Sequence, residues 1–460
     1  MLDLGLIAVL AGLLALGLRR PFLWVLTYIY VDIVSPQKIS YGLLASVPVS
    51  LVMFVAAFAS WLVLDDKRDS RFTLRQGLMV LLLLYCGLTT LLAQFPAEAA
   101  SKWSWVWKAL VFAIFLPLTL RTRLRIEAAA LFMVLSLSAI VIGGGIKTLG
   151  GGGGYGQLSL LVNDNTGIYE GSTLSMVAVA MIPLVVWLAR HGTIFRPDWR
   201  VTLFAAGLVF ACGLIPVGTQ TRTGLLCLAL LAGMSLRSAR RPLLYLASIA
   251  AVLAVAIPFL PASYTGRMST IENHQSDQSA STRLAVWAWT LDYAKDRPFG
   301  GGFNSFLANH IQMEIVDTRT SGSTVTVETT MVQDEARAFH SSYFELLGEQ
   351  GWPGLGLWLA LQAAGLWQME VLRRRWRKRT GPDEQWQAPL ANALQQAQVI
   401  YLVGGAFVGI AYQPMILTII GLQCGLWSYL QRIERGRDDD GPGQLSRPSR
   451  RPRRRPMVAA

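Results

Sequence analysis

The 460-residue chain is 53% hydrophobic and only 15% charged, and its formal net charge is +13. A soluble protein carries about a quarter charged residues, so the composition excludes an ordinary soluble enzyme and indicates a chain that crosses a bilayer repeatedly as helices. The four cysteines lie in apolar runs and form no C-x-x-C pair, which argues against a disulfide framework or a zinc site.

Apolar runs close to the length of a bilayer-spanning helix follow one another along most of the chain. The first has no small-residue cleavage site behind it, so we predict a retained helix rather than a removable signal peptide. The last contains Pro414 near its middle and is long enough for two short spans. The pattern predicts an all-α polytopic membrane protein with 12 or 13 transmembrane helices. The runs are 2–18, 21–34, 42–64, 74–93, 104–120, 126–146, 171–189, 201–218, 223–236, 242–261, 353–371 and 396–431.

The basic residues follow alternate apolar runs, which is the positive-inside pattern of cytoplasmic loops. These basic segments are Arg19/Arg20, Lys67–Arg75, Arg121/Arg123/Arg125, Arg190–Arg200, Arg237–Arg241 and Arg373–Arg379. The segments predicted to face outward are 36–41, 94–103, 147–170, 218–222 and 262–352. The alternation assigns the positive charge to membrane orientation rather than to nucleic-acid binding, and in a bacterial inner membrane the outward side is the periplasm.

Four regions follow from this topology. Residues 1–261 are predicted to form an N-terminal transmembrane region, and residues 353–431 the C-terminal transmembrane helices. Between them, 262–352 is one large periplasmic loop that carries active-site residues, with six Lys/Arg against eleven Asp/Glu. Residues 432–460 are predicted to be a disordered basic cytoplasmic tail held near anionic headgroups.

The glycine-rich stretch Gly143–Gly156 lacks the order of a phosphate-binding P-loop, so we predict a flexible connection there, with Lys147 as a contact for an anionic ligand. Arg222 follows soon after, ahead of an apolar run of only about 14 residues. A spanning helix must therefore begin earlier, which draws Gln220 and Arg222 into the membrane margin, where ionisable groups most often face a polar cavity. The alternative is a helix-end arginine that reaches the lipid headgroups.

The large outward loop begins with apolar residues at helical spacing. Leu284, Trp287 and Leu291 share one face, which predicts a helix on the membrane surface that ends before Arg297 and Pro298. Residues 317–333 are predicted to form a mobile flap or a short hairpin. Arg283 has two interpretations, a surface ion pair or a bidentate phosphate ligand.

His340 lies where this loop re-enters the membrane, and an imidazole exchanges protons near neutral pH. We predict that it is catalytic. Glu345, one helical turn and a residue later, either orients this neighbourhood or is a carboxylate favoured at a helix start. The other histidines have no second histidine at metal-ligand spacing, so we expect solvated or structural roles for them and no metal site.

Three motifs together resemble the O-antigen ligase superfamily: Gln-Thr-Arg-Thr-Gly at 220–224, Arg283 with Trp287 before a proline and glycine run, and the stretch from His340 to Gly351. The turn 163–166, which contains Asn165, is similar to a further feature of that family. Family members commonly carry Asn where this chain has Ser341. The segment 35–42 also resembles O-glycosylation ligases associated with exosortase systems.

The resemblance implies a GT-C-like membrane glycosyltransferase that moves a glycan from an undecaprenyl-diphosphate carrier to an acceptor at the periplasmic face, without metal or other cofactor. Arg222 and Arg283 would bind the donor diphosphate and His340 would activate the acceptor hydroxyl, with inversion. Glu345, Asn165, Lys147 and Gln220 would support them.

The possible transferase functions differ in the acceptor that receives the glycan. The first is an O-antigen ligase of lipopolysaccharide biosynthesis, whose acceptor is lipid A–core. A protein O-oligosaccharyltransferase or an O-antigen polymerase would use the same donor. A lipid-linked glycan flippase is the alternative from another class, although no internal repeat of the kind many transporters show is visible. A scaffold in the cell envelope would leave the His340 cluster without a purpose.

Overall fold

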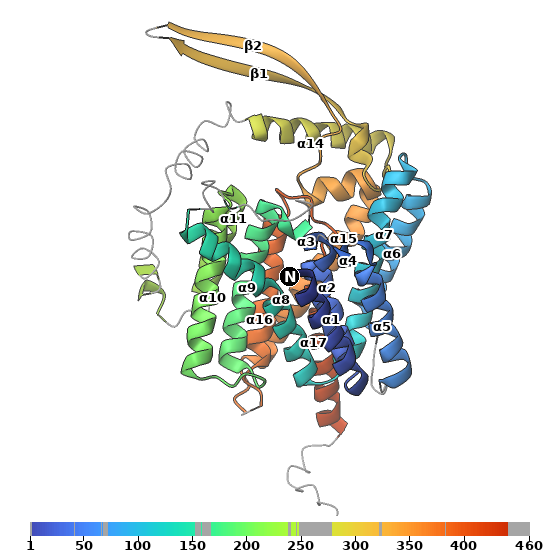
Figure 1. Ribbon diagram of the computed structural model, residues 1–460, viewed down its shortest axis with the longest axis vertical. Coiled ribbons are helices and arrows are strands. Elements are labelled where there is room, and N and C mark those ends of the chain that lie inside the picture. The colour runs from blue at the N-terminus through green and yellow to red at the C-terminus, as the bar shows by residue number, and fades with distance from the viewer. Residues whose placement is uncertain are drawn as a thin grey trace, which may run out of the picture.

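The computed structural model is a bundle of helices with a β-hairpin projecting from one end (Figure 1). It describes residues 2–40, 42–65, 67, 72–151, 158, 167–237, 241–244, 246–247, 278–321, 324–381 and 383–439. The chain is thus a polytopic, mainly helical membrane protein, as the hydropathy pattern predicts.

The helices follow the apolar runs closely. The bundle contains α1 (Leu2–Arg19), α2 (Phe22–Val34), α3 (Pro36–Ile39), α4 (Leu43–Ser46), α5 (Val49–Leu64), α6 (Leu74–Leu91), α7 (Pro96–Thr119), α8 (Arg123–Leu149), α9 (Gly171–His191), α10 (Trp199–Gly218), α11 (Arg222–Leu236), α15 (Ser342–Trp376), α16 (Gln387–Gly404) and α17 (Pro414–Asp439). Four of them, α6, α8, α9 and α10, are long and apolar enough to cross a membrane, and α1, α2, α5 and α11 are shorter apolar helices. The predicted run 242–261 lies mostly outside the described residues, so the number of spans stays a prediction.

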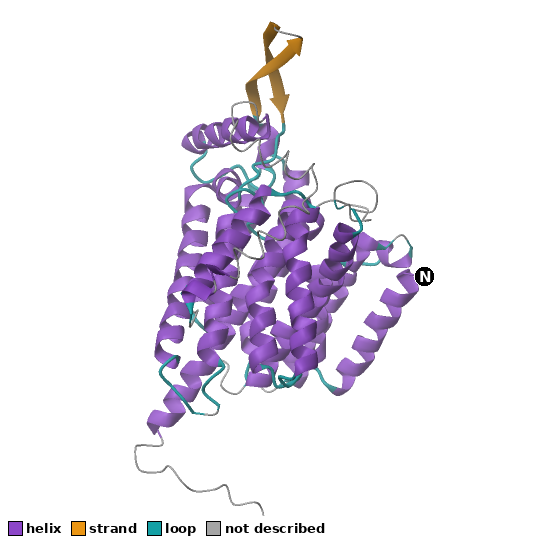
Figure 2. Cartoon of the chain, turned by 90° about the vertical axis from the view of Figure 1, so that its left-hand side faces the viewer, coloured by secondary structure: helices purple, strands orange, loops and turns teal. Residues whose placement is uncertain are grey.

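The described parts of the segments predicted to face outward lie at one end of the bundle (Figure 1), which we call the hairpin end because the two strands project from it (Figure 2). The backbone of Gln94 bonds Gly301 at 2.9 Å, and that of Leu158 bonds Gly218 at 2.7 Å. Segments far apart in sequence therefore meet there, as an alternating topology requires.

The described parts of the basic segments lie at the other end, which we call the tail end because α17 ends there (Figure 1). Arg125 forms a two-pronged ion pair with Asp65, at 2.6 and 2.8 Å. Arg375 pairs with Glu434 at 2.7 Å. One member of the basic set behaves differently: Arg75 is fully buried in the bundle and donates to Gln423 at 2.9 Å.

The glycine-rich stretch is not a flexible connection throughout, and that prediction was wrong for residues 143–149, which continue α8. The reason is close packing of α8 on α10. A Cβ on Gly144 would lie 2.8 Å from Ile215, and one on Gly145 would lie 3.2 Å from Ala211. Glycine here lets two helices approach, whereas the stretch 152–157 lies outside the described residues.

The large loop contains α14 (Gln278–Asp296) and a hairpin of β1 (His310–Ser321) and β2 (Thr324–Glu335). The strands are antiparallel and pair His310 with Glu335. The structure therefore decides between the two predicted forms of residues 317–333 in favour of a hairpin. α14 ends before Pro298, as predicted, and its Leu284 and Leu291 remain exposed.

α15 contains a kink at Gly351, whose φ is +63°. A Cβ there would lie 2.2 Å from the carbonyl oxygen of Pro298, so only glycine fits this turn. The predicted end of the loop, residue 352, coincides with the kink. However, the chain is already helical from Ser342, so the helix starts eleven residues before residue 353, where it was predicted to begin.

At the C-terminus, Pro414 opens α17 and divides the last apolar run into two helices, as predicted. The tail is not disordered from residue 432, because α17 continues to Asp439. Glu434 stabilises this extension by its ion pair with Arg375. Residues 440–460 lie outside the described part of the chain.

Candidate active site

His340 sits at the hairpin end, in the turn that precedes α15. Its backbone φ is +48°, a conformation that non-glycine residues rarely adopt and that is often found at functional sites. Trp287 of α14 fixes both sides of this turn. Its indole N–H donates to the Phe339 carbonyl at 2.8 Å, and its ring stacks on Phe344 with centroids 4.9 Å apart.

The charges around His340 come from three separate segments. Burial is the largest effect and lowers the pKa of His340, and the guanidinium groups of Arg283 and Arg337 lower it further. The Glu170 carboxylate, at the start of α9, acts in the opposite direction. Arg283 and His340, which sequence reasoning placed in one site, are thus brought together, with the imidazole held neutral.

Arg222 is the first residue of α11, so the helix begins only one residue before the apolar run 223–236, and the prediction of a start several residues earlier was wrong. The preceding Thr221 makes no side-chain capping bond. Its hydroxyl instead donates to Ser175 of α9 at 2.9 Å. The amide groups that open α11 therefore lack this cap and lie next to Arg222 in the chain, and the start of a helix favours an anion.

The turn before Arg222 leads back to His340 through α9. Gly171 packs against Thr219 and Thr221, where a Cβ would find neighbours 3.5 to 3.8 Å away. Glu170, next to Gly171, is the carboxylate that acts on His340. Its oxygens also cap α9 by accepting from Ser172 and Thr173. Glu170 therefore links the Arg222 turn with the His340 turn.

Two of the supporting residues lie beside this turn. Gln220 is buried and has a φ of +52°. Lys147 is in the last turn of α8, and its neighbour Thr148 fills the space beside Gly218, where a Cβ would lie 2.0 Å from the hydroxyl oxygen. Asn165 falls outside the described residues.

Glu345 is not a free carboxylate. It accepts from Lys102 of α7 at 2.6 Å and from the backbone N–H of Ala411 at 3.0 Å. Lys102 also donates to Glu349 at 2.7 and 2.9 Å, and the Asn304 N–H donates to Glu349 as well. One lysine thus bridges two carboxylates on successive turns of α15, so the interpretation of Glu345 as an orienting group is the one that these contacts favour.

Sequence reasoning missed Lys102, Glu349 and Glu170. A signal was present: Lys102 lies six residues before Lys108, and Lys108 interrupts the apolar run 104–120. Ionisable groups inside or beside a membrane span most often face a polar cavity. Asp32, in the apolar run 21–34, is a third charge of this kind.

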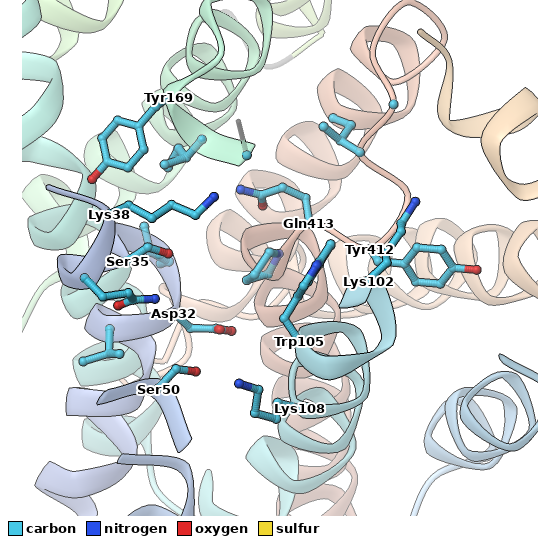
Figure 3. Close-up of a pocket in the computed structure, with 18 of the residues that line it drawn as sticks. Asp32, Ser35, Lys38, Ser50, Lys102, Trp105, Lys108, Tyr169, Tyr412 and Gln413 are labelled. Atoms are coloured by element: carbon cyan, nitrogen blue, oxygen red, sulfur yellow. The ribbon is translucent and has the colours of Figure 1, made fainter. Parts of the chain in front are cut away.

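A cavity of about 530 Å³ lies among these charges. Figure 3 shows Asp32 and Lys108 extending toward each other across it, and Lys38 extending toward Gln413. Tyr169 and Glu345 are also in its wall. Tyr169 is the neighbour of Glu170, and Glu345 follows His340 by five residues, so the chain connects two parts of the cavity wall with the surroundings of His340.

The fold is that of a polytopic helical membrane protein with a cluster of charged residues at one end of the bundle. Residues 206–359 match the O-antigen ligase family, and residues 1–193 match a family of unknown function (DUF5935). No curated protein matches the chain. This match at residues 206–359 supports the O-antigen ligase superfamily and a function of the O-antigen ligase or polymerase type.

Proposed function

We propose that the protein transfers a glycan from undecaprenyl-diphosphate to lipid A–core at the periplasmic face of the bacterial inner membrane. The main support is that Arg222, Arg283 and His340 all fall within the stretch that matches the O-antigen ligase family. The effect of Arg283 on the pKa of His340 adds a spatial reason to group two of them.

In the proposed reaction, the acceptor hydroxyl oxygen attacks the anomeric carbon of the donor sugar while the bond from that carbon to the diphosphate breaks. The hydroxyl proton passes to the neutral imidazole of His340. The bonding electrons leave with the diphosphate, whose growing charge Arg222, Arg283 and the amide groups opening α11 stabilise. A single attack inverts the configuration.

The hydrogen bonds of the two nearby carboxylates, Glu345 and Glu349, support His340 as the general base. Glu345 already accepts from Lys102 and from Ala411, and Glu349 from Lys102 and Asn304. Two carboxylates held in this way are poor acceptors for a further proton. The lowered pKa of His340 leaves its imidazole neutral at physiological pH.

The test is glycan transfer in membranes supplied with undecaprenyl-diphosphate-linked glycan and lipid A–core. We expect wild-type activity, and its loss in His340→Ala, Arg222→Ala and Arg283→Ala at equal expression. Arg→Lys at either position should also be damaging, because a point charge does not replace a two-pronged fork. His310→Ala is the matched control, since His310 is exposed on the hairpin and pairs with Glu335.

Each other result points to a definite change. Equal transfer by wild type and His340→Ala would remove His340 from the chemistry. Transfer to protein or to a growing glycan, but not to lipid A–core, would change the proposed acceptor and leave the proposed donor unchanged. Variants that transfer normally but no longer move lipid-linked glycan across the bilayer would make the protein a flippase.

A further inference from the structure

The cavity of about 530 Å³ is built largely by the N-terminal part of the chain, the part that matches a family of unknown function. Asp32 comes from α2, Lys38 from α3, and Lys102, Trp105 and Lys108 from α7. The ligase-family stretch contributes Asn304 and Glu345 to the wall. The cavity is therefore a shared site between the two matched regions.

The lining is suited to a neutral, polyhydroxylated ligand. Its wall carries both charge signs, and Asp32 lies close enough to Lys108 for their charges to interact. An anionic ligand would be repelled by the carboxylates of Asp32 and Glu345. An acyl chain would displace the water around the charged side chains and give them no hydrogen bonds in return. Hydroxyl groups both donate and accept hydrogen bonds, so they can satisfy carboxylate, ammonium and amide groups together. A volume of about 530 Å³ is also in the range of ligand pockets, roughly 300–1,000 Å³.

Two side chains of the cavity wall are suited to contact such a ligand. Trp105 is 40% exposed, so an aromatic face is available for the C–H face of a sugar ring. The side-chain oxygen of Gln37 is buried and has no hydrogen-bond partner within the described part of the chain. An unsatisfied buried acceptor is costly and indicates a missing donor.

Backbone strain marks the same place. Among the described residues, the non-glycine positions with positive φ are Ser35, Gln220, Asn304, Ala336 and His340. Ser35 and Asn304 line the cavity, and Gln220 and His340 belong to the candidate site. Such strain persists where the surrounding structure holds it and is concentrated at ligand-binding sites.

We propose that this cavity is a sugar-binding subsite for the acceptor, which the N-terminal region supplies to the transferase site. The inference rests on the proposed function. The acceptor is favoured over the donor glycan because two residues of the cavity wall are connected in sequence to the surroundings of His340, the proposed base for the acceptor hydroxyl. Tyr169 adjoins Glu170, and Glu345 follows His340 by five residues. We infer that an acceptor held in the cavity extends from it to His340, whereas neither Arg222 nor Arg283, the proposed ligands of the donor diphosphate, lines the cavity.

The test separates the two substrates. Initial rates of Trp105→Ala and Lys108→Gln, in nanodiscs, are measured while either lipid A–core or undecaprenyl-diphosphate glycan is varied. We expect the KM for the acceptor to rise about tenfold with Trp105→Ala, the amount that one lost aromatic contact of about 1.4 kcal/mol gives. The KM for the donor and kcat should stay within about twofold. Trp105→Phe should restore the acceptor KM.

Trp199→Ala is the matched control, because Trp199 is an exposed tryptophan at the start of α10, outside this cavity. It should change neither KM. A rise in the donor KM alone would overturn the acceptor assignment and give the cavity to the donor's sugar. Unchanged values for both substrates in Trp105→Ala and Lys108→Gln would overturn the subsite altogether.

A binding measurement keeps this inference separate from the reaction itself. Core oligosaccharide freed of its acyl chains is titrated into the wild-type protein without donor, and saturation-transfer NMR reports contact. Binding that is lost in Trp105→Ala but kept in Trp199→Ala supports the subsite even if the transfer assay fails. No binding to the wild type, together with active transfer, overturns it while leaving the proposed function intact.

Discussion

The two ends of the bundle use similar residues in different ways. At the tail end, arginines are matched by carboxylates of the protein: Arg125 by Asp65, and Arg375 by Glu434. At the hairpin end, the charges converge on one group or on a cavity. Arg283 and Arg337 both act on His340, and one lysine serves two carboxylates.

This difference distinguishes charges that set the orientation of the protein in the membrane from charges that we propose take part in the reaction. Charge pairs at the tail end complete each other and need no ligand, which suits loops whose basic residues set the topology. At the hairpin end, charged side chains line a cavity, and several backbone positions there have a strained, positive φ. Net charge alone would rank the tail end first, but the arrangement of charge supports our proposal that the hairpin end is the functional one.

The largest expected effect comes from Lys102. Lys102→Met leaves Glu345 and Glu349 buried without their shared cation, and Glu349 is fully buried. Removing one partner of a buried ion pair costs about 3–5 kcal/mol. We expect a comparable loss in the free energy of unfolding, measured by denaturant titration in detergent micelles.

The double variant Lys102→Met/Glu349→Gln removes one of the two unpaired charges and should recover part of the loss. Lys67→Met is the control, since Lys67 at the tail end is exposed and should change stability little. A Lys102→Met protein as stable as the wild type would mean that the two carboxylates are solvated or protonated, and that the bridge is not a structural element.

Trp287 tests whether the hairpin end needs a fixed geometry. Trp287→Phe keeps the stack on Phe344 but loses the hydrogen bond to Phe339, next to His340. Small misplacements of a reacting group reduce rates strongly. We expect kcat to fall about tenfold, with the donor KM unchanged, in the transfer assay. Trp289→Phe is the matched control on the same helix, where the ring stacks on Tyr293 instead. An equal fall in both variants would indicate general damage to α14.

The sequence predicts most of the fold because a bilayer leaves few choices. Apolar runs must become helices there, since no water satisfies the backbone, and nearly every run did. The errors came where packing between helices decides. The glycines 143–145 predict a flexible connection because glycine disfavours isolated helices, but the contacts of Gly144 and Gly145 with α10 stabilise the helix there.

The candidate site is less predictable, because its parts meet through long-range contacts. Arg283 and His340 were expected to lie in one site, and the structure agrees. Nothing in the local pattern shows that Glu170 and Lys102 approach the same end, since these contacts join residues more than 150 positions apart. The charges within the apolar runs, Asp32 and Lys108, could have revealed the cavity by their position alone.

The pH dependence of transfer gives a smaller effect with a definite sign. His340 must be neutral to accept a proton, so activity is lost as pH falls through its pKa. Burial, Arg283 and Arg337 lower that pKa, so the acid limb of kcat/KM should lie below the ordinary imidazole value of 6.5. Arg337→Gln should move this limb toward higher pH, and Glu170→Gln should move it toward lower pH.

These two variants control for each other, because they remove opposite charges and shift the limb in opposite directions. Gln at position 170 keeps one acceptor oxygen, so it can retain one of the two backbone contacts, from Ser172 or Thr173, that cap α9. Shifts of the same sign in both, or an acid limb that neither variant moves, would show that the titrating group is not His340.

The smallest effect belongs to the tail end, and it completes the comparison. Arg125→Ala removes the ion pair with Asp65, in which both side chains are partly exposed. Pairs of this kind contribute about 0–1 kcal/mol, so the unfolding midpoint should fall only slightly, and less at high salt. Transfer activity per folded molecule should not change, because this charge serves structure rather than the reaction. If Arg125→Ala instead reduced kcat as strongly as Trp287→Phe, the two ends would be coupled through α8, and the separation between orientation and chemistry would fail.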